Sequence, residues 1–126
     1  MNILIADDQR AILRTYQILC EWEGYKVFTA DTPEKAKKIF QERKIQIGIF
    51  DFDFGEGENG IDLLLYTRRF RENFPIILNT SSPNSAETFI GNLSPQDQEL
   101  LSPLLICFKM TIDMIKERID EVLLKT

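Results

Sequence analysis

Short apolar runs that alternate with segments of helical period constrain the fold of this chain most. Five such runs begin at Asn2, Tyr25, Ile45, Pro75 and Leu104. Between them, apolar residues recur with the spacing of an amphipathic helix. Parallel strands need crossover connections of this kind, because a tight turn joins only antiparallel strands. The pattern therefore predicts an α/β fold, a doubly wound five-stranded parallel sheet with helices on both faces.

Five helices are expected in the segments that follow the strands. The first extends from about Gln9 to Glu23, and the last from about Thr111 to Leu124. Ser94 is expected to cap a short helix, whereas residues 81–85 have the composition of a loop. The apolar stripe of the last helix comprises Ile112, Ile115, Ile119, Val122 and Leu123. We therefore expect one domain over residues 1–126.

The composition fits a globular protein and argues against two classes of partner. Of 126 residues, 44% are hydrophobic and 28% are charged, with a net charge of −5. An acidic chain offers no basic face for nucleic acid. No apolar run is long enough to span a bilayer, and the N-terminus lacks the basic start of a signal peptide. We expect a cytoplasmic protein that binds neither nucleic acid nor a membrane.

Histidine is absent and the cysteines are few, which limits the chemistry available. Cys20 and Cys107 lie within apolar stretches, as buried thiols of a reducing compartment do. Without histidine, the chain lacks the commonest zinc ligand and the usual general base. It is also excluded as the histidine-bearing donor of a phosphorelay.

Polar side chains follow four of the five predicted strands, at the point where each strand ends. In an open parallel sheet, ligands bind outside the carboxyl ends of the strands. These side chains are therefore expected to meet at one edge and to bind a divalent metal and a phosphoryl group. They are Asp7, Asp8, Asp51, Asp53, Thr80, Ser81 and Lys109.

The four aspartates predict a Mg²⁺ site. Adjacent carboxylates repel each other unless a cation offsets their charge, and Mg²⁺ prefers oxygen ligands. Asp8 and Asp51 are the proposed direct ligands, Asp7 acts through a water, and Asp53 contributes its backbone carbonyl. The alternative is that Asp7 begins a turn and Asp8 caps the first helix.

Lys109 and the Thr80–Ser81 pair predict contacts to a phosphoryl group. A lysine ending a buried strand offers a point charge for a phosphoryl oxygen. The Thr80 hydroxyl and the N–H of Ser81 can hold a second oxygen. The alternatives are an exposed lysine at the start of a helix and a threonine that helps to form a turn.

Five short motifs occur in a fixed order along the chain. They are Ile-Ala-Asp7-Asp8-Gln, the strand ending at Asp51, Asn59-Gly60, Pro75-Ile-Ile-Leu-Asn-Thr80-Ser81 and Phe108-Lys109. In order and spacing, these motifs resemble the receiver domain of two-component response regulators over essentially the whole chain. The resemblance implies a flavodoxin-like fold with strand order 2-1-3-4-5. It also implies that Asp51 accepts a phosphoryl group from a phosphohistidine on a histidine kinase or phosphotransfer protein, with Mg²⁺ between Asp8 and Asp51.

A receiver domain of this kind is a switch rather than an enzyme, and the resemblance implies that Thr80 and Lys109 contact the acyl phosphate. The adduct would assist its own formation and hydrolysis, and the output would pass to a protein partner. We expect a stand-alone receiver without an attached output domain.

The sequence departs from the usual receiver pattern at several positions. Met110 replaces the usual proline after the lysine, and Ile106 replaces a frequent aromatic residue. Phe54-Gly55 stands where the loop after the phosphoacceptor usually has a proline. The loop from Asp51 to Gly60 is one residue longer than is usual for the family. The segment from Thr80 to Lys109 is several residues longer than usual. The first of these loops leaves Asp53 as an alternative phosphoacceptor, although Asp53 would place a carboxylate inside the buried strand.

Two other functions are consistent with the motifs. Asp51-Phe52-Asp53 resembles the Asp-x-Asp of haloacid-dehalogenase-type phosphatases, in which the first aspartate is the nucleophile. That reading leaves Asp7 and Asp8 without a role. The other alternative is a divergent receiver fold that acts as an interaction module and is not phosphorylated.

Overall fold

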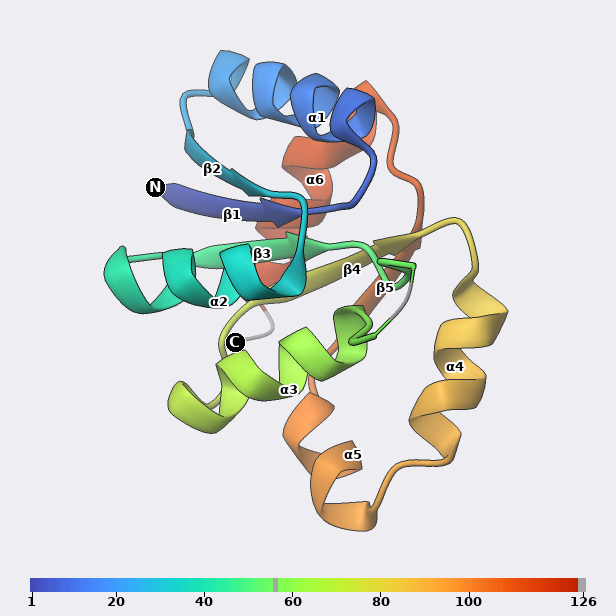
Figure 1. Ribbon diagram of the computed structural model, residues 1–126. Coiled ribbons are helices and arrows are strands. Elements are labelled where there is room, and N and C mark those ends of the chain that lie inside the picture. The colour runs from blue at the N-terminus through green and yellow to red at the C-terminus, as the bar shows by residue number, and fades with distance from the viewer. Residues whose placement is uncertain (56, 125–126) are drawn as a thin grey trace.

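The computed structural model describes residues 1–55 and 57–124 as one parallel sheet covered by helices on both faces (Figure 1). The strands are β1 (Asn2–Ala6), β2 (Lys26–Ala30), β3 (Ile47–Phe50), β4 (Ile76–Thr80) and β5 (Leu105–Phe108). The helices are α1 (Arg10–Trp22), α2 (Pro33–Glu42), α3 (Gly60–Phe70), α4 (Pro83–Gly91), α5 (Pro95–Leu101) and α6 (Ile112–Leu124).

The strand order is β2-β1-β3-β4-β5 and all four pairings are parallel, which confirms the predicted fold. Ala6 at the end of β1 pairs with Phe50 at the end of β3. Thr80 at the end of β4 pairs with Phe108 at the end of β5. The polar residues that follow these strands therefore leave the sheet along the same edge.

Alternating side chains of each strand fill two hydrophobic cores, one on each face of the sheet. Figure 1 shows α1 and α6 on one face of the sheet and α2 and α3 on the other. Ile3 and Ile5 belong to the core beneath α1 and α6, whereas Leu4 and Ala6 belong to the core beneath α2 and α3. Both cysteines are buried, as predicted. Three members of the predicted α6 stripe, Ile115, Ile119 and Val122, belong to the first of these cores; the side chain of Ile112 lies outside the described residues.

The helix ends follow the local signals in the sequence. Gly24 terminates α1 with a φ of 89°, a conformation that glycine adopts without steric cost. The Thr32 hydroxyl caps α2 by accepting a hydrogen bond from the Lys35 N–H. Ser94 caps α5 in the same way through the Asp97 N–H, which confirms the predicted short helix.

The prediction of five helices is wrong, because the described residues form six. Helix α4 begins at Pro83, inside the segment predicted to be a loop. Serine, proline and asparagine favour turns, but proline also fits the first turn of a helix, where its missing N–H is not needed. Ala86 is fully buried, and the Phe89 ring packs edge-on against Phe52 with centroids 5.9 Å apart. Burial of Ala86 in the core and packing of Phe89 on Phe52 therefore override the turn composition of this segment.

A buried arginine joins α3 to the segment between α5 and β5. The Arg68 guanidinium donates hydrogen bonds to the carbonyl oxygens of Phe74 (3.1 Å), Leu100 (3.2 Å), Pro103 (2.5 Å) and also Leu101. Burial lowers the pKa of Arg68 to about 10. Because three of these four carbonyl groups lie at the end of α5 or just after it, this side chain holds the α5 segment against α3.

Replacing Arg68 with methionine should lower the free energy of unfolding by about 3 kcal/mol, because buried carbonyl groups would lose their donors. The neighbouring Arg69 is the matched control. Its side chain is 56% exposed and pairs with Asp97, so Arg69→Met should change stability by less than about 1 kcal/mol. Urea denaturation of both variants measures the difference. Equal losses in the two variants would contradict the role assigned to Arg68.

Gly60 is required where α3 approaches the end of β3. Its N–H donates to the Phe52 carbonyl at 2.7 Å, and a Cβ atom added to it would lie 1.9 Å from the Asp51 carbonyl oxygen. The Asn59–Asp62 capping box starts the helix at this point. The glycine therefore allows α3 to begin directly beside Asp51.

We expect Gly60→Ala to destabilise the protein by about 1–3 kcal/mol, because neither backbone can move away without distorting the end of β3. Gly91→Ala is the control, since an added Cβ there meets no atom of the described chain within 4 Å. Chemical denaturation should separate the two variants clearly. A Gly60→Ala protein as stable as the control would refute the close approach.

Candidate functional site

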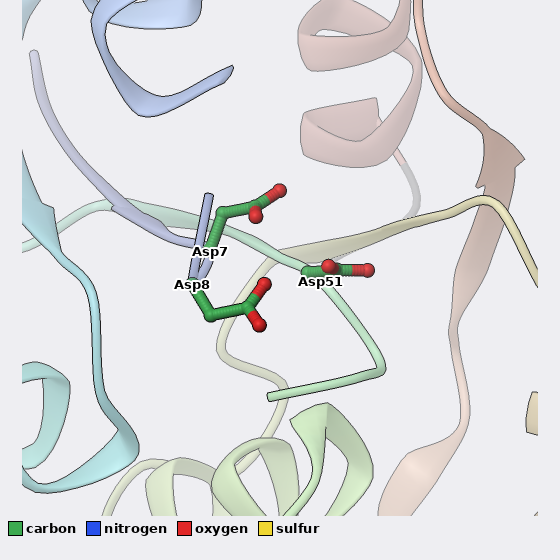
Figure 2. Close-up of side chains that lie close together, drawn as sticks. All are labelled: Asp7, Asp8 and Asp51. Atoms are coloured by element: carbon green, nitrogen blue, oxygen red, sulfur yellow. The ribbon is translucent and has the colours of Figure 1, made fainter. Parts of the chain in front are cut away.

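Three aspartates meet at the carboxyl ends of β1 and β3 (Figure 2). One carboxylate oxygen from each of Asp7, Asp8 and Asp51 lies within 4.8 Å of the other two. Asp7 and Asp51 are only 2% and 6% exposed, whereas Asp8 is open to solvent. The parallel register of β1 and β3 thus brings together carboxylates that are more than forty residues apart in the chain.

Lys109 reaches this cluster from the end of β5. Its Nζ lies 3.0 Å from Asp7 Oδ2 and 3.4 Å from Asp51 Oδ1, and its side chain is 21% exposed. Burial would lower the pKa of Lys109, but the hydrogen bond to Asp7 and the charge of Asp51 outweigh it and raise the pKa. The alternative of an exposed lysine at the start of a helix is therefore wrong.

Asp51 is the carboxylate with the least compensation. Its Oδ1 is buried and accepts no hydrogen bond from any residue that the structure describes, although the Lys109 ammonium is near. Burial, together with the charge of Asp7, raises the pKa of Asp51 to about 6. An orphaned buried oxygen of this kind needs a further cation or donor.

Asp7 and Asp8 divide the roles that the sequence left open. Asp7 Oδ1 accepts a hydrogen bond from the Gln9 N–H at 2.9 Å, so the alternative in which Asp7 begins a turn is confirmed. The N-cap of α1 is Gln9, with no side-chain hydrogen bond, so the alternative of an Asp8 cap is wrong. Partial burial and then the Asp7 charge raise the pKa of Asp8. The Asp8 carboxylate thus caps no helix and faces its acidic neighbours (Figure 2).

Asp53 lies outside this carboxylate cluster. Its side chain is exposed, and Oδ1 accepts a hydrogen bond from the Gly55 N–H at 2.8 Å. Its charge still contributes to the raised pKa of Asp8. The residue that follows Gly55, within the predicted 54–59 loop, lies outside the described residues.

Thr80 and Ser81 follow β4 in different environments. Thr80 is fully buried, and its Oγ1 accepts a hydrogen bond from the Ser82 N–H at 2.9 Å. The alternative of a threonine that supports a turn is therefore confirmed. Its backbone carbonyl accepts from the Lys109 N–H at 3.2 Å, which ties β4 to the lysine. Ser81 is exposed.

Sequence reasoning missed the two buried hydrogen bonds that hold the residue after Lys109. The Asn79 Oδ1 accepts from the Met110 N–H at 2.8 Å, and the Tyr16 hydroxyl donates to the Met110 carbonyl at 2.9 Å. One signal was available, because an amide side chain inside a buried strand requires a hydrogen-bonding partner. Nothing in the sequence identifies that partner, since it lies 31 residues away.

The sequence profile of the response regulator receiver domain matches residues 3–94. The chain belongs to this family. The match includes the acidic cluster and the end of β4, and it makes the chain a signalling domain. It also leaves the phosphatase reading of Asp51-Phe52-Asp53 without support.

Two curated relatives show how far the similarity extends in sequence. The receiver domain is 39% identical over 67 residues to the alginate biosynthesis transcriptional regulatory protein AlgB of Pseudomonas putida, covering 53% of this chain and 15% of that protein. It is 30% identical over 104 residues to the aerobic respiration control protein ArcA of Escherichia coli, covering 81% of this chain and 42% of that protein. The chain thus spans less than half the length of these relatives, and a stand-alone arrangement stays a prediction.

Solved structures show the same fold. The response regulator TrrA of Thermotoga maritima, solved with Mg²⁺ and BeF, aligns over 96% of this chain and 97% of its own with a TM-score of 0.77 and 21% identity. A CheY-like receiver domain of Methanospirillum hungatei aligns over 99% of this chain and 98% of its own, with a TM-score of 0.71 and 23% identity.

Among the helices of the described residues, none is long and apolar enough to cross a membrane.

The buried charge on Asp51 predicts a measurable dependence of stability on pH. Because the folded-state pKa of about 6 exceeds the ordinary value of 3.8, ionisation of Asp51 opposes folding. The stability that this group contributes when protonated is therefore lost as the pH rises from about 4 through 6. Without Mg²⁺, Asp51→Asn should be more stable than the wild type by about 2 kcal/mol at pH 7.5, and by much less at pH 4.

Denaturation curves of the wild type and of Asp51→Asn at several pH values test this expectation. Asp53→Asn is the control, because that exposed carboxylate should give a difference close to zero. A stability gap between wild type and Asp51→Asn that stays constant from pH 4 to 7.5 would refute the raised pKa.

Proposed function

We propose that this receiver domain is a phosphorylation-controlled switch that accepts a phosphoryl group on Asp51. The observation that carries the proposal is the Asp51 carboxylate itself. It is buried, it lies beside two further carboxylates and an ammonium group, and its Oδ1 accepts no hydrogen bond from the described part of the chain. A carboxylate that only served stability would have its oxygens paired.

The donor set fits Mg²⁺. Asp8 and Asp51 would bind the ion directly, Asp7 through a water, and Asp53 through its backbone carbonyl. All are hard oxygen ligands, and three of the carboxylates already lie within 4.8 Å of one another. The ion would supply the charge that allows an anionic phosphate to approach an anionic carboxylate. The Mg²⁺ and BeF bound to TrrA support this choice of ion.

The transfer would convert the Asp51 carboxylate into an acyl phosphate. A carboxylate oxygen forms a bond to phosphorus while the P–N bond of a phosphohistidine breaks, and the imidazole leaves with the bonding electron pair. The raised pKa of Asp51 leaves the group ionised, and therefore nucleophilic, at pH above about 6. The donor would be a histidine kinase or a histidine phosphotransfer protein, because this chain has no histidine.

Lys109 and Thr80 would stabilise the product. The Lys109 Nζ is already 3.4 Å from Asp51 Oδ1 and would donate to a phosphoryl oxygen. The Thr80 hydroxyl accepts from the Ser82 N–H, so its own proton is left to donate to a second oxygen. The Ser81 N–H would supply a third contact. The contacts that draw Thr80 and Lys109 toward the phosphate bias a two-state equilibrium of the domain.

The signal would pass to a protein partner in the cytoplasm. The chain carries a net charge of −5, which favours neither nucleic acid nor an anionic membrane as a direct ligand. The domain would assist its own phosphorylation and dephosphorylation, without turning over a separate substrate.

The proposal is tested by incubating the protein with acetyl phosphate and Mg²⁺ and locating the added mass by peptide mass spectrometry. We expect one phosphoryl group on Asp51, complete loss of labelling in Asp51→Asn, and labelling of Asp53→Asn within about tenfold of the wild-type rate. Removing Mg²⁺ with a chelator should abolish labelling of the wild type.

Two results would overturn the assignment. Label that survives Asp51→Asn and disappears in Asp53→Asn would make Asp53 the acceptor. A folded wild-type protein that takes up no phosphate and binds no beryllofluoride would favour the interaction module that is not phosphorylated.

A further inference from the structure

The peptide group that follows Lys109 is held by two buried side chains from other parts of the fold. The Asn79 Oδ1 in β4 accepts from the Met110 N–H at 2.8 Å, and both groups are buried. The Tyr16 hydroxyl in α1 donates to the Met110 carbonyl at 2.9 Å, also in a buried environment. Three elements of the fold, β4, α1 and the β5–α6 turn, are thus joined at one residue.

Each of these hydrogen bonds pairs a buried backbone group of Met110. Met110 is buried, so its N–H and carbonyl would lose hydrogen bonds to water without gaining replacements. Asn79 is itself buried in β4, as are its neighbours Leu78 and Thr80, so its side-chain amide needs a hydrogen-bonding partner as well. Burial raises the pKa of Tyr16, and this effect is larger than the opposing effect of its side-chain hydrogen bond with Asn79.

Lys109 lies directly against this arrangement. Its own N–H donates to the Thr80 carbonyl at 3.2 Å, and its φ is 21°, outside the usual helix and strand regions. The backbone on both sides of the lysine is therefore held by β4. From this fixed point the side chain extends to Asp7 at 3.0 Å and to Asp51 at 3.4 Å.

We infer that Asn79 and Tyr16 are positioning residues for the phosphoryl-transfer site, which act through the Met110 peptide to aim the Lys109 ammonium at Asp51. This inference rests on the proposed function of Asp51 as phosphoacceptor. Neither residue touches the reacting atoms. Asn79 holds the turn from the sheet, and Tyr16 holds it from α1, the helix that begins directly after Asp7 and Asp8.

The experiment compares Asn79→Leu, which keeps the size of the side chain and removes the acceptor, with Tyr16→Phe, which removes one hydroxyl. Initial rates of labelling by acetyl phosphate with Mg²⁺ should fall about tenfold or more in the first and by a smaller factor in the second, because misplaced groups lose much of their effect. Tyr66→Phe is the control, since its hydroxyl bonds Gln41 on α2 away from Lys109, and should label at the wild-type rate.

Epistasis with Lys109 separates positioning from general damage to the fold. In a Lys109→Ala background, which labels slowly by itself, Asn79→Leu should cause no further loss if it acts through the lysine. An equal fold-loss in both backgrounds would show a merely structural role and overturn the inference. Labelling of the Asn79→Leu single variant at the wild-type rate would overturn it too.

A second readout does not depend on phosphorylation. In ¹⁵N NMR spectra of the Lys109 ammonium, the wild-type signal should be shifted and protected by its contacts with Asp7 and Asp51. Asn79→Leu should move it toward the position of an exposed lysine, and Tyr66→Phe should not. An unchanged Lys109 signal in a folded Asn79→Leu protein overturns the inference, whereas a wild type that takes up no phosphate overturns only the proposed function.

Discussion

The charge balance between Asp7, Asp51 and Lys109 is the interaction on which the rest of the site depends. Two almost fully buried carboxylates share one ammonium group, with Nζ–O distances of 3.0 and 3.4 Å. Asp7 takes the closer contact and also accepts a hydrogen bond from a backbone N–H, whereas Asp51 Oδ1 has the longer ion-pair contact and accepts no hydrogen bond from the described residues. This unequal sharing lowers the stability of the fold when both carboxylates are ionised.

The parallel sheet makes that charge cluster possible. Each crossover returns the chain to the same end of the sheet, so the residues after β1, β3, β4 and β5 reach one edge. Helix α3 begins beside Asp51 because Gly60 lacks a side chain that would meet the Asp51 carbonyl. The acidic cluster is thus a result of strand register and close helix approach together.

The region after β4 is built differently from the rest of the domain. Helices α4 and α5 lie between β4 and β5, and Arg68 ties the end of α5 and the residues after it to α3 through three backbone carbonyls. The position in β5 that often carries an aromatic residue holds Ile106, which packs partly buried against the α2–α3 core. In α4, Phe89 packs edge-on against Phe52, the residue that follows Asp51.

Much of the fold and of the site was predictable from local patterns in the sequence. Apolar runs and helical periods defined the five strands, the Thr32 and Ser94 caps and the end of α1 at Gly24, because these features depend on neighbouring residues. The placement of Asp7, Asp8, Asp51 and Lys109 at one edge followed from the rule for parallel sheets. The resemblance to receiver domains supplied the strand order.

Other features were decided only by the tertiary structure, because they depend on contacts between distant segments. Turn composition after Thr80 concealed α4, which forms since Ala86 and Phe89 find a surface to pack on. Asp8 does not cap α1, because Gln9 occupies the N-cap position. Arg68 is buried among carbonyl groups that no local pattern brings together. The partners of Asn79 and Tyr16 lie 31 and 94 residues away at Met110, and a hydrogen bond across that separation has no sequence period. The sequence thus determined which groups the site contains, and the packing of distant elements determined which of them are paired and which, like Asp51 Oδ1, accept no hydrogen bond from the described residues.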